Sequence, residues 1–291
     1  MIVRLDLKIP LFSVRIPEAL GVLLSYTLPP PKTVVSLLTR GIGYILDVNP
    51  ELRVHNAPCR VVLTWVTETS CYVTVKPLSP IIKSYQMWRV RWLERKLRID
   101  KKLVPEQLAQ DAVEYNINST SELSFYYFID IENLNKKLEK ALGLRVTSYD
   151  IIKSFWVTER VGATEFLTSL KGVRELEVKT LNSVGEIDTY APSKWLEPRG
   201  PHVIEKMPSI LLLSKPDISL DEFIREYQRR KSTEAYESYT LPLWSEVTER
   251  KVMYKPGKVK VTARNGFSIC LLSDYSSSIL PNNLVKVLKN E

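Results

Sequence analysis

The stretch Phe125-Tyr126-Tyr127-Phe128-Ile129 is an apolar run that leads directly into the signals of a helix. Asp130 can accept a hydrogen bond at the helix N-terminus, and Gly143 can end the helix because glycine tolerates a left-handed backbone. Between them, apolar residues recur every three or four positions from 131 to 142. This stretch therefore predicts a buried strand over 125–129 followed by an amphipathic helix.

Further strands and helices are predicted on both sides of this unit. Strands are expected at 2–9, 59–66, 71–75 and 173–178, and a helix at 34–46. Thr33 can cap that helix, and Gly41 allows another element to pack closely against it. The order is strand, helix, two strands or a strand pair, an insertion, strand, helix, strand. The β-α-β-β-α-β pattern fits it best, which predicts an α+β, ferredoxin-like domain with the general plan of an RNA-recognition domain.

We expect residues 1–185 to form this domain and 186–291 to form a smaller, strand-rich C-terminal lobe. Residues 81–124 interrupt the pattern and predict an insertion that projects from the sheet, with a helix from Pro105 to Val113. In the C-terminal lobe, Ser219 and Glu222 have the spacing of a capping box. Asn265-Gly266 predicts a hairpin between strands at 259–262 and 267–271.

The 291 residues carry 41 Lys plus Arg against 33 Asp plus Glu, a net charge of +8 that favours an anionic partner. Residues 83–102 hold eight cations against two acids, interleaved with Tyr85, Trp88 and Trp92, and 250–264 hold six cations and no acid. Aromatic rings beside cations suit single-stranded nucleic acid. The alternatives are a buried aromatic stripe with solvated charges, or an aromatic surface that binds a partner protein.

Common catalytic and metal-binding motifs are absent, so no cofactor or metal is expected. Three scattered cysteines disfavour disulfides and a zinc site, and no apolar run reaches about 18 residues. We therefore expect a cytoplasmic protein with no membrane partner. The small number of glutamines and the 18 prolines favour an origin in a thermophile. His55 and His202 are either ordinary loop residues or general bases for RNA cleavage.

Two segments together resemble the Cas-five family of CRISPR Cascade subunits, most closely its archaeal type I-A branch. Residues 24–38 contain Ser25-Tyr26-Thr27-Leu28-Pro29-Pro30-Pro31-Lys32-Thr33, similar to the family's S-Y-x-x-P-P-P-[ST]-[ST]. Residues 160–173 begin Arg160-Val161-Gly162-Ala163-Thr164-Glu165-Phe166 and resemble its glycine-containing loop. Lys32 stands where the family has a small hydroxyl residue, and Phe166 where serine is common.

The resemblance implies a ferredoxin-like core with a projecting thumb. It also implies a non-catalytic subunit that binds the 5′ handle of the CRISPR guide RNA, beside the backbone (Cas-seven) and large (Cas-eight) subunits. One branch of the family cleaves precursor RNA, so a metal-independent endoribonuclease is the alternative. The candidate RNA contacts are Arg15, Tyr26, Lys32, Thr33, Arg40, the thumb residues Lys83, Tyr85, Arg89 and Arg91, and Arg160, Gly162, Ala163 and Thr164 of the loop.

Overall fold

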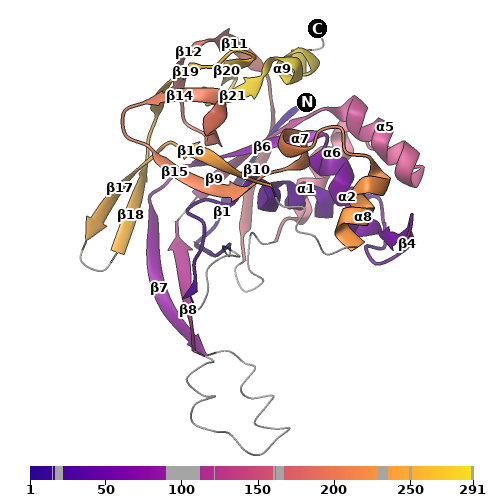
Figure 1. The fold of residues 1–291 in the computed structure, drawn as a ribbon, viewed down its shortest axis with the longest axis horizontal. Coiled ribbons are helices and arrows are strands. Elements are labelled where there is room, and N and C mark those ends of the chain that lie inside the picture. Colours follow the sequence, from indigo (N-terminus) through magenta and orange to yellow (C-terminus); the bar gives the residue numbers. More distant parts are fainter. Residues whose placement is uncertain are drawn as a thin grey trace, which may run out of the picture.

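Figure 1 shows the computed structural model of the chain, with helices gathered on one side and short C-terminal strands stacked beyond the central sheet. The structure describes residues 1–14, 16, 22–89, 112–120, 122–159, 161, 167–228, 235–248 and 251–289. Every structural statement below concerns these residues. Among them, no helix is long and apolar enough to cross a membrane.

The centre of the fold is a four-stranded antiparallel sheet. Its order is β10-β1-β9-β6, with β1 at Ile2–Lys8, β6 at Cys71–Pro77, β9 at Glu122–Ile129 and β10 at Ser169–Leu176. The strands predicted at 2–9, 71–75 and 125–129 are confirmed. The strand predicted at 173–178 is divided, because β10 ends at Leu176 and β11 (Val178–Asn182) pairs with another sheet.

Four helices occur between these strands: α1 (Pro31–Ile45), α2 (Cys59–Glu68), α5 (Ile131–Leu142) and α6 (Ser148–Ser154), the last continued by the 3-10 turn η1 (Phe155–Val157). The strand predicted at 59–66 is wrong, because these residues form α2. Val61, Val62 and Leu63 are all buried there. A short apolar run that is buried on several sides has no clear period, so tertiary packing overrides its β-propensity.

Capping residues were predicted for two helices, α1 and α5. Asp130 accepts a hydrogen bond from the Asn133 amide, and Gly143 ends α5 with φ 69°, as predicted. Thr33 is not a cap: α1 begins at Pro31, so Thr33 already lies inside its first turn. Proline is suited to that first position because it needs no intrahelical partner for an N–H.

Gly41 sets how closely α1 approaches α6. A Cβ atom built at Gly41 would lie 2.2 Å from the carbonyl oxygen of Ser154, the last residue of α6. No larger residue fits without separating the two helices. The close packing predicted for Gly41 is therefore confirmed, and it fixes the position of η1, which follows Ser154.

A two-stranded ribbon projects away from the body of the protein (Figure 1). Its strands are β7 (Ile81–Arg89) and β8 (Ala112–Ser119), which pair from Ile82 opposite Ser119 to Arg89 opposite Ala112. At the base of the ribbon, β8 pairs with β2 (Leu11–Phe12) and β3 (Val22–Leu23). On the other side, β7 pairs with β18 (Lys251–Pro256), and β18 pairs in turn with β17 (Leu243–Thr248).

The ribbon corrects two predicted boundaries. The helix predicted from Pro105 to Val113 lies mostly outside the described residues, but its last two residues, Ala112 and Val113, belong to β8. The insertion predicted at 81–124 extends too far, because Glu122 already begins β9 of the central sheet.

The C-terminal part forms three small antiparallel sheets, ordered β11-β20-β21, β12-β19-β14 and β13-β16-β15. Their remaining strands are β12 (Val184–Ile187), β13 (Ala191–Pro192), β14 (Leu196–Arg199), β15 (Val203–Pro208), β16 (Tyr236–Leu241), β19 (Val259–Ala263), β20 (Phe267–Leu272) and β21 (Ser277–Pro281). The helical elements of this part are η2 (Ser193–Trp195), α7 (Leu211–Ser214), α8 (Leu220–Gln228) and α9 (Asn282–Lys289). In the N-terminal part, the short strands β4 (Arg53–Val54) and β5 (Ala57–Pro58) pair between α1 and α2.

The hairpin predicted around Asn265-Gly266 is wrong. The turn itself is present, with Gly266 at φ 90° and a hydrogen bond from the Phe267 amide to the Arg264 carbonyl. However, β19 pairs with β12 and β14, whereas β20 pairs with β11 and β21. A tight turn dictates only the local reversal of the chain, and here the strands on either side find partners in different sheets.

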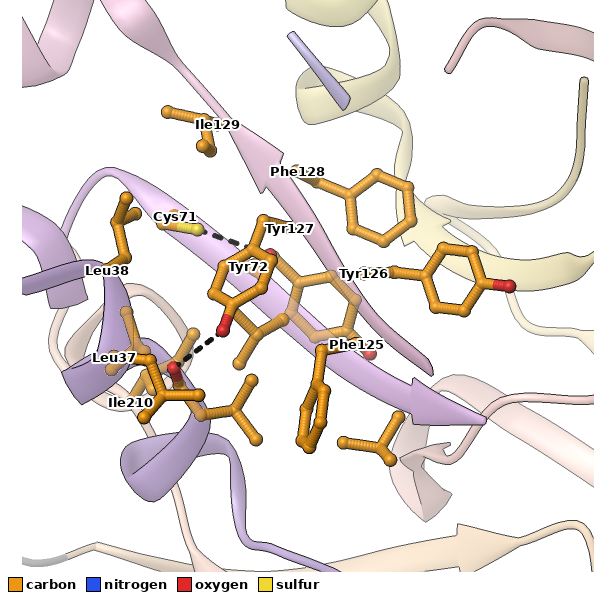
Figure 2. Close-up of a cluster of buried hydrophobic side chains, with 14 of the residues drawn as sticks. Leu37, Leu38, Cys71, Tyr72, Phe125, Tyr126, Tyr127, Phe128, Ile129 and Ile210 are labelled. Atoms are coloured by element: carbon orange, nitrogen blue, oxygen red, sulfur yellow. Dashed lines mark hydrogen bonds between the residues drawn. The ribbon is translucent and has the colours of Figure 1, made fainter. Parts of the chain in front are cut away.

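The central sheet is buried on both faces. Figure 2 shows the side that faces the helices, where Tyr127 of β9 approaches Leu37 and Leu38 of α1 and donates a hydrogen bond to the Val34 carbonyl at 3.0 Å. On the other face, Tyr72 of β6 packs on Trp195 of η2, with ring centroids 5.2 Å apart. One continuous cluster of buried residues therefore joins the N-terminal and C-terminal parts.

Candidate nucleic-acid interface

Residues 25–30 form the approach to α1, and several distant elements hold this segment in place. The Tyr26 amide donates to the Val14 carbonyl at 3.0 Å, and the Tyr190 hydroxyl donates to the Pro29 carbonyl at 3.2 Å. The Tyr26 ring is buried. It therefore supports the segment from within and has no surface on which a base could stack.

A buried ion pair fixes the same segment from the side of β15. The Glu205 carboxylate accepts hydrogen bonds from the amide and the hydroxyl of Thr27, at 3.0 and 3.1 Å. Lys83 of β7 donates to the Ser25 carbonyl at 3.1 Å, and its Nζ lies 3.9 Å from Glu205 Oε1. The two charged side chains are only 14% and 16% exposed. Lys83 is thus committed to internal contacts at the base of the projecting ribbon.

The protonation of this pair follows from its burial. Burial raises the pKa of Glu205, and Lys83 together with the Thr27 donors partly opposes that rise. Burial likewise lowers the pKa of Lys83, and Glu205 opposes that change. Each charge therefore depends on the other, so the pair stabilises the approach to α1 only while both partners are present.

The second matched segment begins where η1 ends. Arg160, Gly162, Ala163 and Thr164 lie outside the described residues. Of the neighbouring described residues, Val161 is buried, and the Thr168 amide donates to the Glu159 carbonyl at 2.8 Å. The ring of Phe155 in η1 packs at a tilt against Tyr127, with ring centroids 4.5 Å apart, and the Tyr127 hydroxyl donates a hydrogen bond to the Val34 carbonyl in α1. Phe155 of η1 and the first turn of α1 therefore contact the same side chain, Tyr127.

The remaining predicted contacts are distributed around these two segments. Lys32 and Thr33 lie half-buried in the first turn of α1, and Arg40 is exposed on the next turns of the helix. The backbone of β7 places Tyr85 opposite Asn116 and Arg89 opposite Ala112 on the ribbon. Arg15 and Arg91 lie outside the described residues. The structure thus brings the start of α1 and η1 together, and places the backbone of Arg89 along the projecting ribbon.

The sheet face on which an RNA-recognition domain would bind RNA is covered here. Arg4 of β1 donates to Asp274 at 2.8 Å, and Tyr126 of β9 donates to the same carboxylate at 3.0 Å. Lys76 of β6 pairs with Asp188 at 2.7 Å. These cations and the ring belong to the contact with the C-terminal part, so this face offers no binding platform.

The electrostatics of the Asp274 site agree with a permanent structural contact. Burial alone would raise the pKa of Asp274, but hydrogen bonds from Ser276, Arg4 and Tyr126 hold that pKa below its usual value. The carboxylate therefore remains charged at neutral pH, and its negative charge is matched by Arg4.

The two histidines lie in separate surroundings. One ring nitrogen of His55 lies 3.0 Å from the Ala141 carbonyl oxygen, and His202 Nδ1 lies 2.8 Å from the Gly200 carbonyl oxygen. Both rings therefore contact backbone carbonyl groups. Among the described residues, no cluster of His, Cys, Asp or Glu could hold a metal ion.

Sequence reasoning missed Tyr190, Glu205 and Asp274 as residues that shape this region. Glu205 lies 178 positions from Thr27, and Asp274 lies 270 positions from Arg4. No pattern in the nearby sequence predicts contacts between residues so far apart in the chain. The one available signal was the alternation of Arg4 and Asp6 with apolar residues in β1, which showed that these charges share one face of a strand.

The fold has a counterpart among solved structures. The chain superposes on "Crystal structure of a CRISPR protein from Archaeoglobus fulgidus" with a TM-score of 0.55 and 14% identity, over 97% of this chain and 99% of that chain. It also aligns with a chain of a "CRISPR RNA-guided surveillance complex" at 9% identity, over 99% and 100% of the two chains, with a TM-score of 0.36. No protein-family profile matches the sequence, and no curated protein matches it either. The chain therefore shares its fold, along nearly its whole length, with the Archaeoglobus protein.

Proposed function

We propose that this protein is a non-catalytic subunit of a type I CRISPR surveillance complex, of the Cas-five kind and its archaeal type I-A branch, which binds the 5′ handle of the guide RNA. The observation that supports this most is the similarity of fold to the Archaeoglobus fulgidus CRISPR protein over almost all of both chains. The segment at 25–33 agrees with it, because buried contacts from three distant elements hold the approach to α1.

We assign the central module to the ferredoxin-like class. Its strands follow the chain order β1, β6, β9, β10, helices α1 and α5 occur between the outer pairs, and the sheet order is β10-β1-β9-β6. This is the β-α-β-β-α-β pattern with two additional helices, α2 and α6. The ribbon β7–β8 corresponds to the thumb, and would meet the RNA where the backbone (Cas-seven) subunit holds it.

The proposed RNA site lies on the side of the protein where α1 begins. Lys32 and Thr33 are at the N-terminus of α1, where backbone N–H groups and the helix dipole favour phosphate. We expect Arg160, Gly162, Ala163 and Thr164 to contribute as well, because they follow η1 in the sequence. Phe155 of η1 contacts Tyr127, which donates a hydrogen bond to the same turn. In the cytoplasm, the large (Cas-eight) subunit would adjoin this end of the RNA.

A titration of the purified protein with handle RNA at several salt concentrations tests the proposal. Each phosphate contact contributes about −0.7 to the slope of log affinity against log salt for a single strand. Replacing Lys32 with alanine should weaken binding and make the slope less steep by about that amount. Lys136→Ala, an exposed lysine on α5, is the matched control. Handle RNA that binds no better than a shuffled RNA would contradict the proposal.

The proposal includes the absence of RNA cleavage, which a separate assay tests. Labelled repeat RNA incubated with the protein in EDTA should remain intact. Specific cleavage that disappears in His55→Ala or His202→Ala would instead establish a metal-independent endoribonuclease. Because the two histidines contact different backbone carbonyls, each variant reports on its own site.

A further inference from the structure

A groove opens on the outer surface of the helical layer, beside Arg40 of α1. It has a volume of about 640 Å³ and lies between α1 and α2, with one side chain from α8. Figure 1 shows these three helices next to one another. Cavities of about 300–1,000 Å³ with mostly apolar walls and a few polar groups are typical sites for small ligands.

The floor of the groove is formed by closely packed helices. At Gly43 of α1, an added Cβ would lie 3.2 Å from the end of the Leu63 side chain of α2. The hydroxyls of Thr39 and Thr67 form a buried hydrogen bond of 2.6 Å between the same helices. These contacts set the spacing of α1 and α2, so the groove is part of the packed structure and does not need a ligand to form it.

Two tyrosines and two arginines border this floor. Tyr44 of α1 is 70% exposed and Tyr227 of α8 is 42% exposed, and both line the groove. Arg60 of α2 forms an ion pair with Glu51. Arg40 of α1 is exposed and has no ion-pair partner among the described residues. The groove therefore combines aromatic surface with one uncompensated guanidinium group.

We infer that this groove is a binding site for a nucleotide, with the base against the tyrosines and the phosphate on Arg40. Aromatic side chains stack on every base, and a guanidinium group binds phosphate through two parallel hydrogen bonds. The ion pair of Arg60 and Glu51 neutralises the neighbouring charge, so the groove holds one anionic group and not a long track of phosphates. The nucleotide comes either from the solution or from the end of an RNA chain.

Calorimetric titration of the full-length protein with AMP, CMP, GMP and UMP tests this site, with uridine and inorganic phosphate as the two half-ligands. At least one nucleotide should bind with one-to-one stoichiometry, and each half-ligand should bind more than tenfold more weakly. Arg40→Ala should lower nucleotide affinity at least about tenfold, because it removes a charge-assisted hydrogen bond. Arg40→Lys should lose most of the same affinity, because lysine cannot form the bidentate pair.

Matched variants separate the groove from general surface effects. Tyr149→Ala removes a tyrosine of similar exposure on α6, and Arg174→Ala removes an exposed arginine on β10; neither residue lines the groove. Both should bind nucleotide as the unmodified protein does, whereas Tyr44→Ala should bind several-fold more weakly. Thermal melting of each variant checks its fold. Failure of all four nucleotides to saturate at millimolar concentration, or equal affinity in Arg40→Ala, would overturn the inference.

A short 5′-phosphorylated single-stranded RNA distinguishes the two sources. If Arg40→Ala and Tyr44→Ala weaken this RNA and the mononucleotide by the same factor, the groove takes an RNA end. If they weaken only the mononucleotide, it takes a free nucleotide. The inference does not rest on handle binding: loss of handle specificity with mononucleotide binding intact would remove the proposed function and leave this site.

Discussion

The two faces of the central sheet use their charged residues in opposite ways. On the face that meets the C-terminal part, Arg4 and Lys76 are paired with Asp274 and Asp188. On the outside of the helices that cover the other face, Arg40 stands beside an open groove with no carboxylate partner among the described residues. A positive side chain can therefore be part of the framework or part of a binding site, and only its partners distinguish the two.

Lys83 shows that the same distinction matters for the proposed RNA site. It belongs to the most basic stretch of the sequence, yet its ammonium group binds Ser25 and Glu205 inside the protein. The excess of +8 cannot by itself locate a nucleic-acid site. Substitutions at single positions distinguish residues that support the fold from those that face solvent.

Replacing Glu205 with alanine should have the largest effect on stability. It would leave Lys83 buried without its partner and remove the acceptor of both Thr27 hydrogen bonds. We expect a loss of about 3 kcal/mol in the free energy of unfolding, measured by urea denaturation. Glu197→Ala is the control, because its pair with Arg264 has the same 3.9 Å separation but is exposed to solvent. Equal losses in both variants would refute the structural role of the pair.

Replacing Asp274 with alanine should come next. The variant loses the acceptor for Arg4 and Tyr126, which connects the central sheet to the C-terminal part. Hydrogen bonds to charged groups contribute about 1.5–3 kcal/mol, and we expect a loss of about 2 kcal/mol in the free energy of unfolding. Asp217→Ala, an exposed position before α8, should change little. If the urea midpoint of Asp274→Ala equals that of the unmodified protein, the ion pair with Asp6 is sufficient to compensate the charge of Arg4.

Replacing Gly41 with alanine should destabilise the protein although alanine favours helices. The new Cβ would overlap the backbone of Ser154, which cannot move independently of α6. We expect a loss of about 1–2 kcal/mol, read from the thermal midpoint. Gly43→Ala should cost less, because its Cβ meets only the movable end of Leu63. The reverse order of the two variants would show that α6 shifts more easily than α2.

The contribution of Asp274 should depend on pH. Because its folded pKa lies below the usual value of 3.8, its contribution is fully present above that value and is lost as the pH falls through the lower, folded pKa. The difference in unfolding free energy between the unmodified protein and Asp274→Asn should therefore be constant near neutral pH and shrink below about pH 4. A difference that grows on acidification would contradict this assignment.

Replacing Tyr275 with glycine should slightly stabilise the protein. Tyr275 has φ 63°, a left-handed conformation that costs an ordinary residue about 1 kcal/mol and glycine almost nothing. The ring is 72% exposed and contacts Lys179 at 4.0 Å, a weak interaction at the surface. Tyr275→Ala removes the ring and keeps the backbone strain, so it separates the contribution of the ring from that of the left-handed backbone. A lower thermal midpoint for glycine than for alanine would show that the backbone there is not strained.

Much of the central module was predictable from local patterns. The alternation in β1, the apolar run in β9 and the cap residues of α5 each reflect an interaction within a few positions of the chain, so the sequence carries their signal directly. The failures have equally physical causes. Val61 and Val62 form a helix because burial outweighs their β-propensity, and the turn at Gly266 reverses the chain without pairing the strands beside it.

The candidate site was less predictable than the fold. The importance of residues 25–33 was predicted from the sequence, but what holds them was not, because Glu205 and Tyr190 come from distant strands and loops. Arg40 was predicted as a contact from its position on α1. The groove beside it depends on α2, a helix that the sequence pattern predicted as a strand.

Strands β1, β6 and β9, helix α5 with its two end residues, and the uneven distribution of charge could all be predicted from the sequence alone. These features depend on neighbouring residues, whose interactions are encoded by spacing along the chain. Which charges are compensated depends on the tertiary structure. Arg4 pairs with Asp274, Lys76 with Asp188 and Lys83 with Glu205, and in each pair the two residues lie far apart in the sequence. A charge becomes part of a binding site where folding brings it no such partner.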